Sequence, residues 1–97
     1  MARFDVYEAS SGLMLDCQAD VLSDLNTRFV VPLMPPDEAP VAGKHLNPFF
    51  QLLGRDLVMV TQFAAAVYVR DLGDRVGSLD HEHSRILNAL DMLIGGY

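Results

Sequence analysis

The chain has 97 residues, of which 51% are hydrophobic and 21% are charged. This length and composition fit one folded domain spanning residues 1–97, and they exclude both a two-domain protein and a disordered chain. Thirteen acidic residues against seven basic ones give a formal charge of −6. We therefore expect no direct binding to nucleic acid, because such binding requires positive surface to neutralise phosphates.

The sequence carries no sign of a membrane span or of export. The longest apolar stretch, residues 57–69, is interrupted by Thr61 and Gln62 and is shorter than the roughly 20 residues that cross a bilayer. The first residues lack the apolar centre of a signal peptide. Cys17 is the only cysteine, so no disulfide can form within the chain, and we expect a small buried side chain. These features favour a cytoplasmic protein with no membrane contact.

The amino-terminal part of the chain has the alternation typical of a β-hairpin. Residues 4–7 and 13–18 predict two strands, and Ser10-Ser11-Gly12 predicts the tight turn between them. We expect these segments to pair as neighbouring antiparallel strands.

An exposed connection and a third strand follow. Residues 20–26 are mostly polar, but Val21 and Leu22 stand side by side within them. Residues 28–33 are β-branched and aromatic, which predicts a strand. Pro32 has no N–H, so we expect this strand to place it at an edge, an end or a bulge.

The middle of the chain predicts a loop and a second hairpin. Residues 34–44 contain three prolines and a glycine and have no period, as in a long surface loop or a small sub-sheet. Residues 49–53 and 57–61 predict two strands joined by Gly54-Arg55-Asp56. We expect this hairpin to be the central pair of the sheet.

The last part of the chain changes from a strand pattern to a helix pattern. Residues 67–70 alternate until Gly73 and Gly77 break the pattern, and from Asp80 the apolar residues recur every 3.6 positions. The predicted apolar stripe of this helix is Ile86, Ala89, Leu90, Leu93 and Ile94. Gly95-Gly96 ends it. The fold class predicted is mainly β, a partly barrelled antiparallel sheet with one carboxy-terminal α-helix.

Catalytic and metal-binding patterns are absent from the sequence. His81 and His83 are two positions apart, so on a helix they point in nearly opposite directions and cannot share a metal ion. The chain has no HExxH, CxxC or glycine-rich phosphate loop. We therefore expect neither an enzyme nor a metal or cofactor site.

The carboxy-terminal helix is unusual because it stays apolar to the end of the chain. Met92, Leu93, Ile94 and Tyr97 lie where free termini are usually polar and frayed. Two explanations remain open. The helix end docks on its own sheet, or it forms a subunit or target interface, where Met and Tyr are enriched.

Five segments in register over nearly the whole chain resemble the CcdB toxin family of toxin–antitoxin modules. The segments are Phe4-Asp5-Val6-Tyr7, Gln18-Ala19-Asp20-Val21-Leu22, Val30-Val31-Pro32-Leu33, Val58-Met59-Val60-Thr61, and residues 79–93 with His81, Ile86 and Asn88-Ala89-Leu90. The resemblance implies an SH3-like barrel with a carboxy-terminal helix, as in CcdB and MazF toxins. It also implies a homodimer with the terminal helices near the two-fold axis.

The resemblance further implies a toxin that acts by binding. Members of the family enter the dimer of the DNA gyrase A subunit and trap gyrase with cleaved DNA. A CcdA-like antitoxin neutralises them through a disordered carboxy-terminal segment that folds onto the toxin. An acidic protein suits such a target, because a cavity that handles DNA is basic.

The resemblance places two sets of functional residues on this chain. The gyrase-binding residues that it implies are Val21, Leu22, Asp91, Ile94, Gly95, Gly96 and Tyr97. The dimer interface that it implies contains Met92, Leu93 and Tyr97. The chain departs from the best-known members at its end, where their terminal tripeptide is tryptophan, glycine and isoleucine. Here the tripeptide is Gly95, Gly96 and Tyr97, and the chain has no tryptophan.

This departure leaves several functions open. Tyr97 supplies the stacking ring that tryptophan supplies elsewhere, or the chain keeps the fold and its antitoxin partner while gyrase poisoning is weak or lost. A scaffold that only titrates antitoxin is a further alternative. The rival activity is a MazF- or Kid-like ribonuclease toxin, for which Arg28, Thr61 and Arg70 are the only candidates. We expect an antitoxin to contact the proline-rich loop, residues 34–44, and the first hairpin turn.

Overall fold

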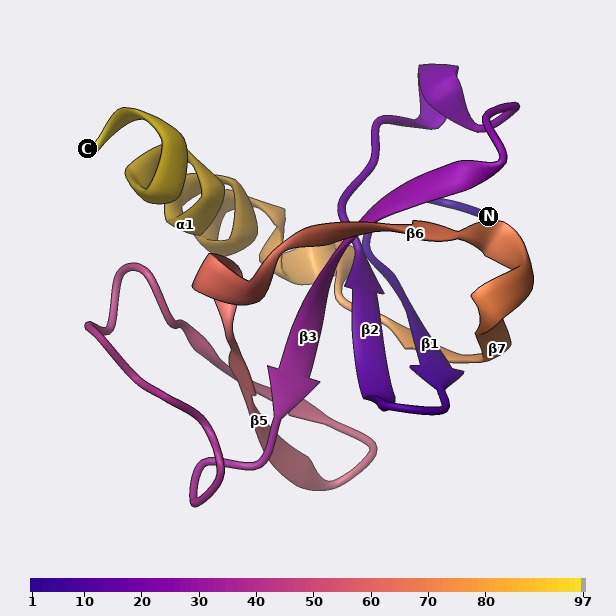
Figure 1. Ribbon diagram of the computed structural model, residues 1–97. Coiled ribbons are helices and arrows are strands. Elements are labelled where there is room, and N and C mark those ends of the chain that lie inside the picture. The colour runs from indigo at the N-terminus through magenta and orange to yellow at the C-terminus, as the bar shows by residue number, and fades with distance from the viewer. Residues whose placement is uncertain (97) are drawn as a thin grey trace.

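The computed structural model of the protein describes residues 1–96, which form a curled antiparallel sheet and a carboxy-terminal helix (Figure 1). The expected fold class, an SH3-like barrelled sheet with a terminal helix, is confirmed. The strands and the helix are β1 (Asp5–Ala9), β2 (Gly12–Asp16), β3 (Thr27–Met34), β4 (Phe49–Leu52), β5 (Arg55–Met59), β6 (Ala65–Tyr68), β7 (Leu72–Ser78) and α1 (His83–Gly95). Short 3₁₀ turns are η1 (Asp20–Leu22), η2 (Thr61–Phe63), η3 (Val69–Asp71) and η4 (Asp80–Glu82).

The strand order is β4-β5-β3-β2-β1-β7, and β6 pairs with β3 beside β5. The first hairpin forms as expected, with β1 and β2 joined through Ser10 and Ser11. The second hairpin is shorter in its connection than expected, because Leu53 and Gly54 alone make the turn, both at positive φ. The expectation that this pair is central was wrong. It lies at one end of the sheet, and β3 is the strand that pairs with three others, β2, β5 and β6.

Pro32 lies inside this central strand rather than at an edge or an end. On one side residues 30–33 of β3 pair with β2, and on the other side β3 changes partner from β6 to β5. The carbonyl of Pro32 accepts a hydrogen bond from Val60 N–H at 3.0 Å, at this changeover. Because the nitrogen and carbonyl of one strand residue point to the same side, the proline nitrogen faces the changeover, where the Val60 carbonyl accepts instead from Phe63 N–H at 2.9 Å.

Strand β7 contradicts the expectation that Gly73 and Gly77 end the strand pattern. Both glycines lie within β7, which pairs with β1 through shifts in register. A Cβ at Gly73 would lie 2.1 Å from the carbonyl oxygen of Glu8, and a Cβ at Gly77 would lie 2.9 Å from Leu52 Cδ1. The glycines therefore permit a close approach that side chains would block, and Leu52 fills the space above Gly77.

The hydrophobic core lies between the concave face of the sheet and α1. Alternate strand residues point into it, and α1 contributes Ile86, Ala89 and Leu90. Burial of each such large aliphatic side chain stabilises the fold by roughly 1.5–3 kcal/mol. The sheet contributes Val6, Leu15, Val31, Leu33, Phe50, Leu52, Leu57 and Met59, with Phe4 from the residue before β1 and Leu79 from the connection to η4.

The terminal helix begins later than the sequence pattern suggested. Asp80 starts the 3₁₀ turn η4, where its N–H donates to the Ser78 hydroxyl at 3.2 Å, and α-helical geometry begins at His83. At the other end, Gly96 adopts a left-handed conformation and donates to the Met92 carbonyl at 2.9 Å. Across residues 1–96, none of the helices has the length and apolarity to cross a membrane.

Candidate functional site

The turn η1 presents an apolar tip to solvent. The side chain of Val21 is 88% exposed and that of Leu22 is 48% exposed, so both predicted contact residues face outward. Leu25 is 49% exposed, and its N–H donates to the Leu22 carbonyl at 3.2 Å. Sequence reasoning missed Leu25, because a single leucine in a polar connection gives no pattern. The tip is defined as Val21, Leu22 and Leu25.

A buried ion pair lies at the base of this tip. Arg28 on β3 donates to Asp16 Oδ2 on β2 through Nε at 2.9 Å and through Nη2 at 2.5 Å. Both side chains are fully buried, and Asp16 Oδ1 accepts from Gln18 N–H at 3.0 Å. The sheet register brings these residues onto one face, because Asp16 lies opposite Val30, two positions from Arg28.

The residues considered for ribonuclease activity do not form a site. Arg28 is buried in its ion pair, and Thr61 is also fully buried, with its hydroxyl donating to the Leu46 carbonyl. Arg70 is exposed, and its guanidinium lies over the Tyr68 ring at 4.6 Å. Two of the three candidates for the ribonuclease alternative are therefore buried, and the burial of Arg28 was not foreseen because hydrophobic alternation does not reveal a buried arginine.

The carboxy-terminal part of α1 leaves the core. The predicted apolar stripe divides, since Ile86, Ala89 and Leu90 are buried while Leu93 is 41% exposed and Ile94 is 80% exposed. In Figure 1 the last turns of α1 extend beyond the sheet. The first explanation for the apolar end, docking on its own sheet, is therefore wrong for these two side chains.

The other residues assigned to the helix end surround this apolar surface. Asp91, Gly95 and Gly96 are exposed, and Met92 is half-buried. Tyr97 lies outside the described residues. The helix-end surface is defined as Asp91, Met92, Leu93, Ile94, Gly95 and Gly96.

Two parts of the predicted gyrase contact are separate within one chain. In Figure 1 the carboxyl end of α1 is at the left and η1 is at the upper right.

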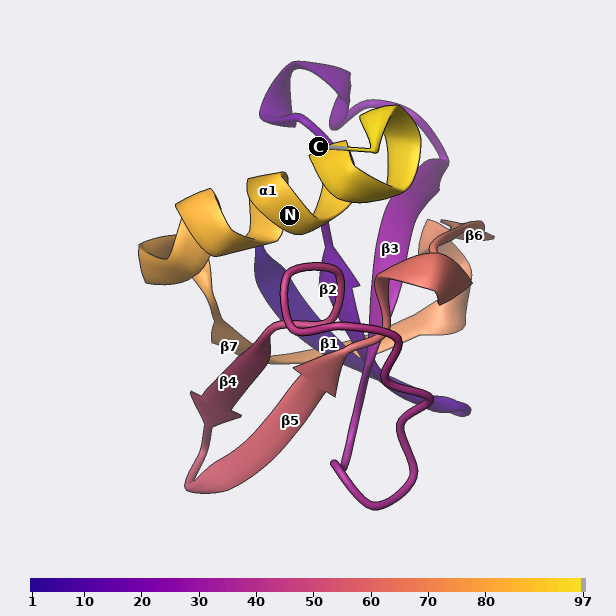
Figure 2. The same ribbon diagram turned by 90° about the vertical axis from the view of Figure 1, so that its left-hand side faces the viewer.

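Beneath α1, a hollow of about 340 Å³ is lined by His45, Asn88, Asp91 and Met92. Figure 2 shows the loop between β3 and β4, which carries His45, passing below the helix.

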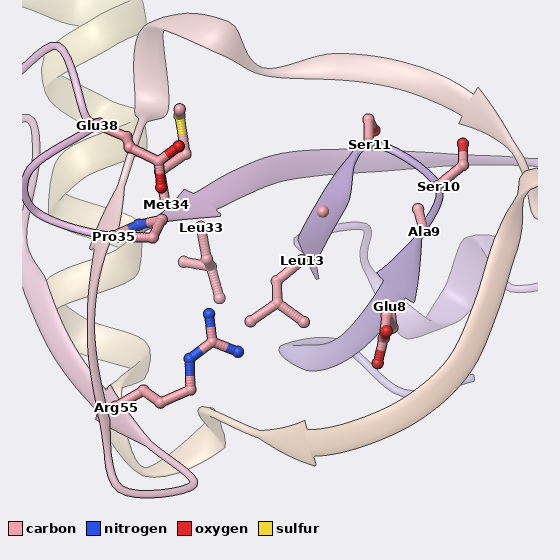
Figure 3. A pocket seen from close by; sticks show the side chains of 11 residues that line it. Glu8, Ala9, Ser10, Ser11, Leu13, Leu33, Met34, Pro35, Glu38 and Arg55 are labelled. Carbon is pink, nitrogen blue, oxygen red and sulfur yellow. The ribbon is translucent and has the colours of Figure 1, made fainter.

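A larger hollow joins the two loops at which an antitoxin contact was expected. It has a volume of about 450 Å³ and lies between the first hairpin turn, the start of the proline-rich loop and β5 (Figure 3). Leu13 and Leu33 line it, Glu38 stands on the loop side, and the guanidinium of Arg55 points into it (Figure 3). Within residues 1–96, Arg55 makes no ion pair.

The ionisable side chains near these surfaces show no sign of an activated nucleophile. Burial raises the pKa of the Cys17 thiol to about 12, with a further contribution from the Asp16 carboxylate. Burial likewise raises the pKa of Tyr7, and the neighbouring Asp5 adds to the effect. His81 and His83 are exposed. In the described part of the chain, no group of three metal-ligating side chains gathers.

A family model described as "CcdB protein" matches residues 3–96. The chain belongs to the CcdB family. Members of this family are toxins of toxin–antitoxin modules, so the resemblance of the five sequence segments is confirmed at the level of the family. The match covers η1 and the helix-end surface, while Tyr97 lies beyond it.

Solved structures of other proteins share this CcdB-type fold. An endoribonuclease from mycobacterial species has a TM-score of 0.78 and 15% sequence identity, covering 98% of this chain and 91% of that one. An endoribonuclease in complex with its cognate antitoxin, also mycobacterial, has the same TM-score and identity, with 98% and 95% covered. Mycobacterium tuberculosis toxin MazF-mt6 has a TM-score of 0.75 and 17% identity, with 93% and 95% covered. These likenesses show the fold alone.

Proposed function

We propose that this CcdB-family toxin binds the DNA gyrase A subunit and traps gyrase on cleaved DNA. The observation that carries the proposal is the exposed apolar end of α1, where Leu93 is 41% exposed and Ile94 is 80% exposed. An uncovered apolar surface at a fixed position is typical of a docking site. The acidic charge of the chain supports a basic, DNA-handling partner.

The proposal includes a symmetric homodimer. Met92 and Leu93 lie beside Ile94 on the last turns of α1 and provide apolar surface for a second copy. A two-fold axis near the helix ends would bring the same apolar surface of both copies together, as in an isologous interface. In such a dimer, Leu93 is buried while Ile94 and Asp91 remain available to the gyrase A subunit.

The proposed toxin acts by binding and not by catalysis. Arg28 and Thr61 are fully buried and occupied with internal partners, which leaves no pair of a basic and a hydroxyl side chain open to RNA among these candidates. The ribonuclease alternative keeps one supporting observation, the fold shared with the endoribonucleases. Incubation of the purified protein with RNA separates the two, since cleavage without gyrase would favour the ribonuclease.

We also propose that the antitoxin docks in the hollow beside Arg55. Leu13 and Leu33 offer an apolar floor, and the Arg55 guanidinium offers a partner for a carboxylate. A segment with an apolar side chain next to an acidic one fits both features. The solved complex of a mycobacterial endoribonuclease with its cognate antitoxin supports an antitoxin partner for a toxin of this fold.

Surface plasmon resonance with immobilised gyrase A subunit tests the proposal. The wild-type protein is expected to bind, and Ile94→Asp is expected to lose affinity at least tenfold, because a charge replaces the apolar contact. Leu53→Asp is a matched control, since Leu53 is similarly exposed at 66% but lies in the β4–β5 turn. Equal affinities for wild type and Ile94→Asp would contradict the helix-end contact.

A further inference from the structure

The apolar tip Val21, Leu22 and Leu25 has little support from its own backbone. Its hydrogen bonds are local, from Leu22 N–H to Ala19 O, from Ser23 N–H to Asp20 O and from Leu25 N–H to Leu22 O, at 3.0–3.2 Å. A 3₁₀ turn of three residues is weak in isolation, because few bonds compensate for the lost backbone entropy. Contacts from outside the turn are therefore needed to stabilise its conformation.

Gln18 connects this tip to the sheet. Its side-chain Nε2 donates to the Leu22 carbonyl at 2.9 Å, and its Oε1 accepts from Phe29 N–H on β3, also at 2.9 Å. The residue is 8% exposed, so its side chain is largely shielded from water, although both bonds are only partly buried. One side chain therefore couples the last residue of η1 to the central strand β3.

The backbone of Gln18 is held in place by the buried ion pair. Its N–H donates to Asp16 Oδ1, and the other oxygen of Asp16 is held by Arg28. On the near side of the turn, Arg3 N–H donates to Asp20 Oδ1 at 2.7 Å. A continuous series of hydrogen bonds therefore links the buried Arg28–Asp16 pair to Gln18, and Gln18 to the exposed tip.

We infer that Gln18 is a positioning residue for the target-binding surface of η1, which comprises Val21, Leu22 and Leu25. The inference rests on the proposed binding to the gyrase A subunit. Gln18 touches no target. It keeps the tip in its bound shape before contact, which reduces the ordering entropy lost on binding.

Two matched variants test the inference. Gln18→Met keeps the side-chain length and removes both hydrogen bonds to Leu22 and Phe29. Gln62→Met is the control, because Gln62 also bridges two groups, accepting from Asn47 Nδ2 and donating to the Pro40 carbonyl at 2.7 Å, but it does so in η2. Both variants lose two hydrogen bonds of 2.7–2.9 Å, so a general effect of removing side-chain hydrogen bonds would appear in both.

Three measurements distinguish positioning from stability. Affinity for purified gyrase A subunit is expected to fall about tenfold in Gln18→Met, as for a loss of two neutral hydrogen bonds, and to stay unchanged in Gln62→Met. Amide exchange at Ser23 and Leu25 is expected to speed up only in Gln18→Met. In a double-mutant cycle with Val21→Ala, the two losses should be less than additive, because Gln18 acts through the tip.

The outcomes separate this inference from the proposed function. Wild-type protein that does not bind gyrase A subunit would overturn both. Wild-type binding with equal affinity in Gln18→Met would overturn the role of Gln18 alone, as would unchanged amide exchange in that variant. Additive losses in the double-mutant cycle would assign Gln18 an effect independent of Val21 and also overturn it.

Discussion

Arg28 and Asp16 form a fully buried ion pair in which the guanidinium Nε and Nη2 both donate to the same carboxylate oxygen. The pair joins β2 to β3 and stands at the base of the exposed tip on η1. A buried pair of charges contributes little net stability as a pair, but the loss of one member leaves an isolated charge in the interior. This asymmetry gives the first prediction.

Replacement of Arg28 by methionine is expected to destabilise the fold by about 3–5 kcal/mol, because Asp16 would then be buried without its partner. The free energy of unfolding in urea measures this loss. The control is Glu82→Gln, because Glu82 pairs with Arg85 at 3.1 Å and the two side chains are 27% and 48% exposed, and an exposed pair contributes under about 1 kcal/mol. Similar losses in the two variants would show that burial does not decide the effect.

The Cys17 thiol is expected to make stability fall at high pH. The thiol of the unfolded chain ionises near its ordinary pKa of 9, whereas the folded chain retains the proton up to a pKa of about 12. The stabilisation is therefore complete below pH 9 and is lost as the pH rises toward 12. Urea unfolding across this range should show the decline in wild type and a shallower one in Cys17→Ala. If the free energy of unfolding fell equally with pH in wild type and in Cys17→Ala, the raised pKa of the thiol would be contradicted.

Replacement of Leu93 by glutamate is expected to convert the proposed dimer to a monomer of 10.7 kDa. A charge at the centre of an apolar interface would be buried without a partner, at a cost of several kcal/mol. Sedimentation velocity measures the change in mass. Leu53→Glu adds the same charge at an exposed site in the β4–β5 turn and is expected to leave the mass unchanged. A monomeric wild-type protein would contradict the dimer.

Charge reversal at Arg55 is expected to weaken antitoxin binding while gyrase binding is kept. Arg55→Glu removes the cation from the hollow beside Leu13 and Leu33, so an acidic segment should bind at least tenfold more weakly. Arg70→Glu makes the same charge change on a different surface, where Arg70 lies over Tyr68. Isothermal titration with the cognate antitoxin measures the affinities. An equal loss of antitoxin affinity in both variants would show that the net charge of the protein, and not a specific contact of Arg55, determines binding.

The alternation of apolar residues revealed most of the sheet, and its failures have local causes. Strand β7 was missed because Gly73 and Gly77 resemble turn residues, although they serve close contacts with Glu8 and Leu52 that exist only after β1 and β4 have folded nearby. The place of the β4–β5 hairpin at the end of the sheet depends on long-range pairing with β3, which no local pattern encodes.

The candidate site was also predictable only in part, because local sequence patterns reveal some of its residues and long-range contacts determine the others. Val21 and Leu22 stand out as apolar residues in a polar segment, and the helix end stands out because it lacks polar residues. The roles of Gln18 and Arg28 are invisible in the sequence, since their partners Phe29 and Asp16 are brought close by the register of β2 and β3. The role proposed for Arg55 could not be predicted either, because it depends on a hollow that three separate segments of the chain form.

The most direct test of the central claim is DNA cleavage by purified gyrase with supercoiled plasmid and ATP. With the wild-type protein present, linear plasmid should accumulate after the trapped complex is denatured. A truncated protein lacking residues 95–97 should produce much less of it. Absence of linear plasmid with the wild-type protein would contradict the proposal that this toxin traps gyrase on cleaved DNA, and an undiminished yield with the truncated protein would contradict the contact at the helix end.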